Sequence, residues 1–135
     1  GKTFTCYVLR HCPNYSQCKD LWKTKHYPFH AIKEGHDMLC DFLEDLGFED
    51  YVGMVSYDTT HRIENKIVSD NPEIPNVDIS SQPITNDYES VRKLMKYKQA
   101  AHYSSSTNMA GGLKRSLELI DNHKRDGSRP AIILM

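Results

Sequence analysis

A hydroxyl-rich loop that leads into a glycine-containing helix is the part of this sequence best suited to chemistry. Residues 104–108 read Ser-Ser-Ser-Thr-Asn, and Gly111 and Gly112 follow within the next turn. Hydroxyl oxygens are hard ligands that suit Mg²⁺ or Ca²⁺. The alternative role is structural, with Thr107 or Asn108 capping the helix. A glycine in a helix interior lowers stability by roughly 1 kcal/mol relative to alanine. Close packing of this helix on a sheet would explain why the two glycines are present.

A second candidate is a thiolate and imidazole site near the start of the chain. Cys12, Cys18, His26 and His30 follow the pattern C-x5-C-x7-H-x3-H. Only the H-x3-H part has a spacing common in zinc sites. The pattern therefore favours unrelated polar side chains over zinc.

Nucleophilic catalysis has no recognised signature in this chain. The sequence contains no G-x-S-x-G, no P-loop and no G-x-G-x-x-G. The seven histidines are scattered, as surface histidines are. We therefore predict that this stretch is not an enzyme.

The composition is that of a folded globular chain of one domain. The 135 residues carry 17 basic and 18 acidic side chains, a formal net charge of −1. This balance gives no reason to expect binding to nucleic acid or to a membrane surface. The longest apolar run is 131–135, too short to span a bilayer.

Four cysteines leave the redox state open. Cys6, Cys12, Cys18 and Cys40 allow two disulfides in three pairings. Small buried thiols are the equally weighted alternative.

Apolar spacing and turn residues divide the chain into short elements. Helices are predicted at 29–46 (ended by Gly47), 87–101 and 109–123. Strands are predicted at 3–9, 51–57 and 131–135. A further strand at 61–68 is expected to return antiparallel to 51–57, and a proline-rich loop follows at 69–86. We interpret 1–28 as an insertion or edge element. Apolar strands that alternate with amphipathic helices predict an α/β fold with a doubly wound, mainly parallel sheet flanked by helices. The first strand of that sheet is either 3–9 or missing from this chain.

Three segments together resemble a von Willebrand factor type A domain, particularly bacterial members of that family. Tyr51-Val-Gly-Met-Val-Ser-Tyr-Asp58 is similar to the family's second strand. Ser106-Thr-Asn-Met-Ala-Gly-Gly-Leu113 is similar to its threonine loop, and Arg129-Pro-Ala-Ile-Ile-Leu-Met135 to the strand before its T-D-G motif. The resemblance covers residues 29–135, interpreted as a partial domain.

The resemblance implies a metal-ion-dependent adhesion site at the carboxyl ends of the strands. Thr107 matches the family's threonine ligand, which would hold Mg²⁺, and Ser105, Ser106 and Asn108 would line the site. A protein partner would fill the open coordination position with a carboxylate. The resemblance thus implies a non-catalytic adhesion module, with the cell envelope as the favoured location.

Two other pieces of the family's metal site have no counterpart in this sequence. No D-x-S-x-S occurs, and the chain ends where T-D-G would begin. We expect that the chain is a fragment whose site is completed outside it. The alternatives are a degenerate, metal-free binding module, with 10–14 in place of the metal loop, and a regulatory domain of a chelatase-type ATPase machine.

Overall fold

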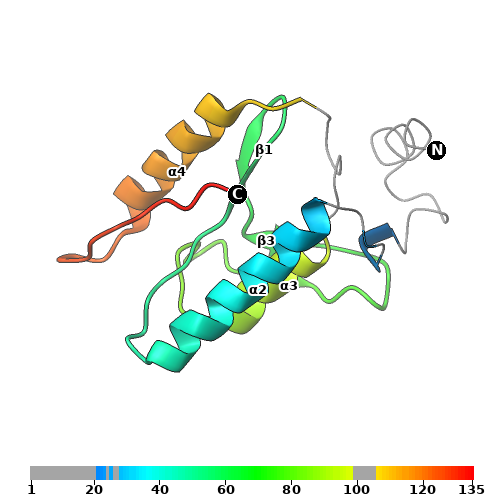
Figure 1. Ribbon diagram of the computed structural model, residues 1–135, viewed down its shortest axis with the longest axis horizontal. Helices are drawn as coiled ribbons and strands as arrows, with labels where there is room; N and C mark the ends of the chain where they lie inside the picture. Colours follow the sequence, from blue (N-terminus) through cyan, green and yellow to red (C-terminus); the bar gives the residue numbers. More distant parts are fainter. Residues whose placement is uncertain (1–20, 24, 26–27, 99–105) are drawn as a thin grey trace.

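Helices dominate the architecture, and the strands are only two or three residues long. The computed structural model describes residues 21–23, 25, 28–98 and 106–135. In chain order the elements are η2 (Leu21–Lys23), α2 (Phe29–Leu46), β1 (Val55–Tyr57), β2 (His61–Ile63), β3 (Lys66–Ile67), β4 (Val77–Asp78), α3 (Tyr88–Lys96) and α4 (Met109–His123). Figure 1 shows α2 lying along α3, with α4 on the other side of the β1–β2 hairpin.

The predicted doubly wound parallel sheet is wrong. In the described part of the chain, β1 pairs with β2 and β3 with β4, both antiparallel, in two separate sheets. The reason lies in the connections, because a parallel pair needs a long crossover, whereas Asp58–Thr60 turns the chain straight back after β1. The predicted strand 61–68 divides at Glu64 and Asn65 and contributes to both sheets.

Two further predicted segments differ from the structure. The run 131–135 is exposed, has no regular secondary structure and joins no ladder among the described residues. The predicted loop 69–86 contains β4, and Thr85 bridges Val52. Proposed strand 3–9 lies outside the described residues.

Helix boundaries follow the sequence signals closely. α2 and α4 begin and end where the sequence predicts. Gly47 ends α2 in the left-handed conformation, with φ of 66°, which glycine adopts without steric cost. α3 is shorter than predicted: Asp87 caps it by accepting from the Ser90 backbone N–H, and it ends at Lys96. None of the described helices is long and apolar enough to cross a membrane.

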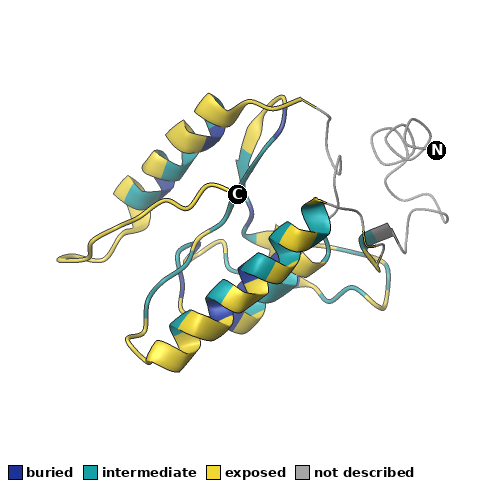
Figure 2. Ribbon diagram, viewed as in Figure 1, coloured by how far each residue is buried: buried dark blue, intermediate teal, exposed yellow. Residues whose placement is uncertain are grey.

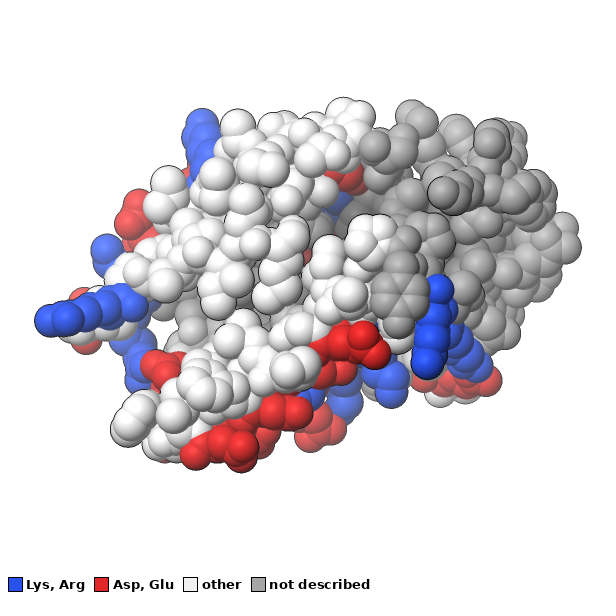
Figure 3. Space-filling model, in the orientation of Figure 1, with Lys and Arg blue, Asp and Glu red and all other residues white. Residues whose placement is uncertain are grey.

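The core is small and lies between α2, α3 and the nearby loops (Figure 2). Cys40, Tyr88 and Val91 form its centre, and Leu43, Val52 and Ile79 pack against them. The apolar spacing of α3 predicts four inward side chains, and the structure confirms them, because all four are buried: Tyr88, Val91, Leu94 and Met95. Arg92 of α3 also bonds Asp41 and Glu44 of α2, at 2.6 and 2.8 Å. Acidic side chains gather along this margin of α2 (Figure 3).

The apolar spacing of α4 predicts one stripe made of Met109, Leu113, Leu117 and Ile120, but the helix faces the hairpin with a different side. Met109, Leu113 and Leu117 are exposed and Ile120 is half-buried, whereas Gly112 and Leu119 are buried. A Cβ at Gly112 would lie 2.6 Å from Cδ1 of Tyr57, closer than two carbons can pack. The glycine therefore permits the helix to approach β1, as the predicted close packing requires.

Replacing Gly112 with alanine should destabilise the fold. Overpacking costs about 1–3 kcal/mol, whereas alanine gains roughly 1 kcal/mol over glycine in a helix. We expect a lower urea midpoint, measured by circular dichroism. Gly35→Ala is the matched control, because a Cβ there meets nothing within 4 Å, and it should raise the midpoint. Equal stabilisation by both changes would contradict the packing argument.

Candidate functional site

The predicted threonine loop lies at the N-terminal end of α4. Ser106, Thr107 and Asn108 are all exposed, and Ser105 is outside the described residues. Asn108 is the N-cap, and its Oδ1 accepts a hydrogen bond of 2.9 Å from the Gly111 backbone N–H. The capping role, which the sequence left as the alternative to ligand binding, is therefore confirmed for Asn108.

Gly111 leaves room for this cap. A Cβ at Gly111 would lie 2.7 Å from the Asn108 Nδ2 atom. The two glycines are therefore needed for different contacts. Gly112 leaves space for the Tyr57 side chain, and Gly111 leaves space for the capping side chain of Asn108.

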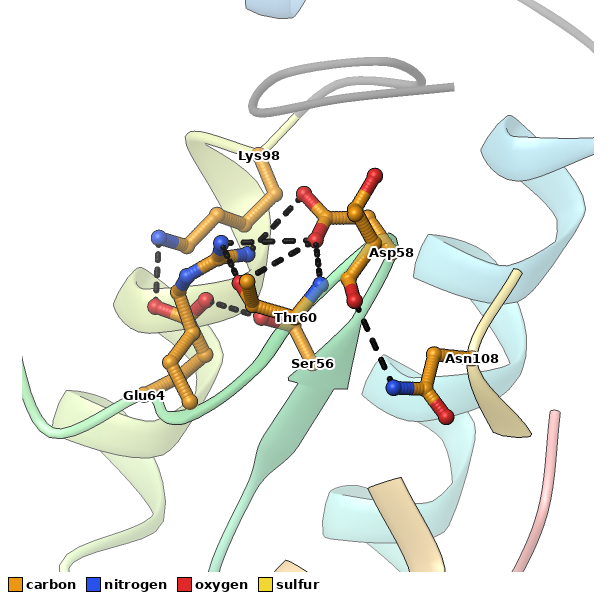
Figure 4. A network of polar contacts seen from close by, with 8 residues as sticks. Ser56, Asp58, Thr60, Glu64, Lys98 and Asn108 are labelled. Carbon is orange, nitrogen blue, oxygen red and sulfur yellow. Dashed lines mark hydrogen bonds and ion pairs between the residues drawn. The ribbon is translucent and has the colours of Figure 1, made fainter. Parts of the chain in front are cut away.

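The loop is anchored to the turn between β1 and β2 (Figure 4). The Asn108 backbone N–H donates to the Asp58 carbonyl at 2.6 Å. The Asn108 side-chain amide donates to the Thr59 carbonyl at 3.3 Å. One asparagine therefore caps the helix and fixes its start against the hairpin.

Asp58 is buried, and its carboxylate organises the turn. It accepts from the Thr60 backbone N–H at 2.7 Å and from Arg62 Nη1 at 3.2 Å. Burial alone would raise the pKa of Asp58, but the hydrogen bonds from Thr60 and Arg62 and the guanidinium charge lower it below its usual value. The carboxylate is therefore ionised and already engaged by a cation.

A second polar cluster joins the hairpin to the end of α3. Glu64 accepts from the Ser56 hydroxyl at 2.5 Å, and its other oxygen lies 2.6 Å from Lys98 Nζ (Figure 4). The side chains of Glu64 and Lys98 are only 5% and 12% exposed. Charges this deeply buried are retained in proteins when they are paired.

Sequence reasoning missed this pair. The available signal was Glu64 itself, a charged residue inside the predicted strand 61–68, between Ile63 and Ile67. Nothing in the sequence identifies Lys98 as its partner, because the two residues are far apart in the chain and lie on different predicted elements.

The described residues do not fit a divalent cation at Thr107. Mg²⁺ requires several oxygen ligands, usually including carboxylates. Thr107 offers a single neutral hydroxyl, and Asp58, which lies on the adjoining turn, is bound by Arg62. In the part of the chain that the structure describes, no group of three or more His, Cys, Asp or Glu side chains could hold a metal ion.

The zinc hypothesis falls mostly outside the described residues, as Cys12, Cys18 and His26 do. His30 lies in the first turn of α2, with Nε2 3.5 Å from Glu34 Oε1. Cys40 is a free, buried thiol, in agreement with the buried-thiol alternative for this cysteine.

Comparison of the chain with family models, with curated proteins and with solved structures gave no match. The similarity to von Willebrand factor type A domains therefore remains a prediction from the quoted segments.

Removing the Glu64 charge should be costly. In Glu64→Gln, Lys98 loses its buried counter-charge, and breaking such a pair costs about 3–5 kcal/mol. The double variant Glu64→Gln with Lys98→Met should recover part of this loss, because neither charge remains. Chemical denaturation of the wild type, the two single variants and the double variant measures the coupling.

The control for that cycle is Glu89→Gln, which breaks the exposed i,i+4 pair with Lys93 and should change stability little. If Glu64→Gln were as mild as Glu89→Gln, the buried pair would have no structural role.

Asn108 and Thr107 should differ sharply in their effect on stability. Asn108→Ala removes the cap of α4 and should cost about 1 kcal/mol. Thr107→Ala alters an exposed hydroxyl and should leave the unfolding midpoint unchanged. Thermal or urea unfolding checks both variants, and a larger loss for Thr107→Ala would contradict the assigned roles.

Proposed function

We propose that this chain is a non-catalytic protein-binding module that binds through an exposed apolar face. The face has two helical stripes and the C-terminal run. Its members are Met38, Phe42 and Leu46 of α2, Met109, Leu113 and Leu117 of α4, and Ile132, Ile133, Leu134 and Met135. This exposed surface is the observation that carries the proposal.

The spacing of these residues supports a binding surface rather than scattered exposure. Each stripe has three large side chains at steps of four, which places them on one side of their helix. Phe42 is 58% exposed and Leu117 is 55% exposed. In Figure 3 a continuous uncharged area extends over α4, the C-terminal run and the adjacent margin of α2. Apolar patches of this kind mark interaction sites in soluble proteins.

In the described part of the chain, the state of the buried reactive side chains favours binding over catalysis. Burial raises the pKa of the Cys40 thiol, and burial lowers the pKa of His36. Both groups are therefore neutral at pH 7 and enclosed. Glu64 and Asp58 are committed to the ion pairs described above.

The resemblance to von Willebrand factor type A domains leads to a similar expectation, because it implies non-catalytic adhesion to a protein partner. The family's mode, a carboxylate held through Mg²⁺, would use Thr107, with Ser106 and Asn108 beside it. Because the described residues do not fit the cation there, no step of our proposal uses it, and the apolar face is the proposed binding surface.

A site-specific photo-crosslinker tests the proposal. Benzoylphenylalanine at Phe42 or Leu117, in cells that naturally produce the protein, should give a discrete adduct with a second polypeptide. The same probe at Val68, which is exposed and belongs to neither helical stripe nor the C-terminal run, is the matched control. Absence of adducts from both face positions, or the same adduct from Val68, would refute the proposed binding surface.

A further inference from the structure

We infer that the partner on the apolar face is a second copy of this chain, in a two-fold symmetric dimer that pairs α2 of each copy with α4 of the other. The inference rests on the proposed function and identifies the protein that binds the apolar face. It follows from the matched stripes of the two helices and the opposite charge beside them.

The two stripes have the same length and spacing. Met38, Phe42 and Leu46 follow one another at steps of four along α2, and Met109, Leu113 and Leu117 do the same along α4. At 1.5 Å per residue each stripe is roughly 12 Å long. Helical stripes of equal length and spacing can pack against each other along their whole length.

The α2 stripe has a row of carboxylates beside it. Asp37, Asp41 and Asp45 each directly precede one of its apolar residues, so this row runs parallel to the stripe. Over its full length α2 contains one lysine and five acidic residues. Arg92 binds Asp41 and Glu44, which leaves an acidic excess along the helix.

The region around the α4 stripe has the opposite sign. Residues 109–129 contain five Lys or Arg and three Asp or Glu. Two of these acids lie in local ion pairs, Glu118 with Arg115 and Asp121 with Lys124. The remaining charges are Lys114, Arg125 and Arg129 against Asp126. In Figure 3 basic side chains lie at the left end and upper left of the face, and others lie beside the acidic margin of α2.

These properties favour a second copy over an unrelated partner. A pairing of α2 with α4 places an acidic helix beside a basic region, and two-fold symmetry repeats that favourable contact. Pairing α2 with α2 would oppose two acidic rows. The face exposes ten large apolar side chains, and a stable interface of this kind buries roughly 800 Å² per partner.

Sedimentation of the full chain tests the dimer. Over a concentration series reaching about 100 μM, the weight-average mass should rise to a plateau at twice 15.6 kDa. Phe42→Lys places a cation opposite the basic region, and Leu117→Glu places an anion opposite the acidic row. Each variant alone should weaken association at least about tenfold, which corresponds to a loss of roughly 1.4 kcal/mol.

Mixing the two variants gives the decisive measurement. An equimolar mixture of Phe42→Lys and Leu117→Glu should recover the dimer, because the lysine introduced in one copy then faces the glutamate introduced in the other, while the second contact is unchanged. Val68→Lys should dimerise like the wild type. Circular dichroism confirms that each variant is folded, as expected for side chains more than half exposed.

Several results would overturn the inference: a wild-type chain that stays monomeric, single variants that still dimerise, a mixture that does not recover, or a mass that rises without a plateau. The photo-crosslinking experiment separates this failure from failure of the proposed function. An adduct from Leu117 with a different protein would retain the binding module and exclude the second copy.

Discussion

The arrangement of this protein depends on the buried charge pair between Glu64 and Lys98. Glu64 follows the β1–β2 hairpin and Lys98 follows α3, so their contact joins two segments that are distant in sequence. Ser56 on β1 binds the same carboxylate. The strands are too short to stabilise either two-stranded sheet through its own ladder, because hairpins of this size are marginal in water. The polar contacts and the packing of α4 on Tyr57 supply what the ladders lack.

The hairpin is consequently the common support of both halves of the molecule. On one side α4 packs on the hairpin at Gly112 and is hydrogen-bonded to it through Asn108. On the other side it is linked through Glu64 to the end of α3, which packs with α2 over the small core. The proposed binding surface includes the exposed apolar stripes of both α2 and α4. The hairpin lies between these helices and therefore determines the distance between the two stripes.

Local signals predicted the helices well because helix ends are decided within a few residues. Gly47 at the end of α2 and Asn108 at the start of α4 are readable from the sequence alone. The β1–β2 hairpin was also readable, because the turn at Asp58–Thr60 predicted an antiparallel return, and β1 pairs with β2 in that sense. The larger parallel sheet was wrong because its assembly depends on contacts between distant residues, and the apolar run 131–135 has strand propensity without a partner among the described residues. The side of α4 that faces inward was mispredicted for a related reason: Met109, Leu113 and Leu117 dominate the spacing pattern, but an absent side chain, at Gly112, decides which side can approach.

The capping arrangement at the start of α4 also constrains how this sequence can change over evolution. Asn108 occupies the space that a methyl group at position 111 would need. An alanine at 111 therefore requires the Asn108 side chain to turn away or to be replaced by a shorter cap such as serine. The two positions are coupled, because a shorter cap removes the close contact that the added methyl group would create. Homologous sequences should consequently covary at these positions, with asparagine accompanied by glycine and serine tolerating alanine.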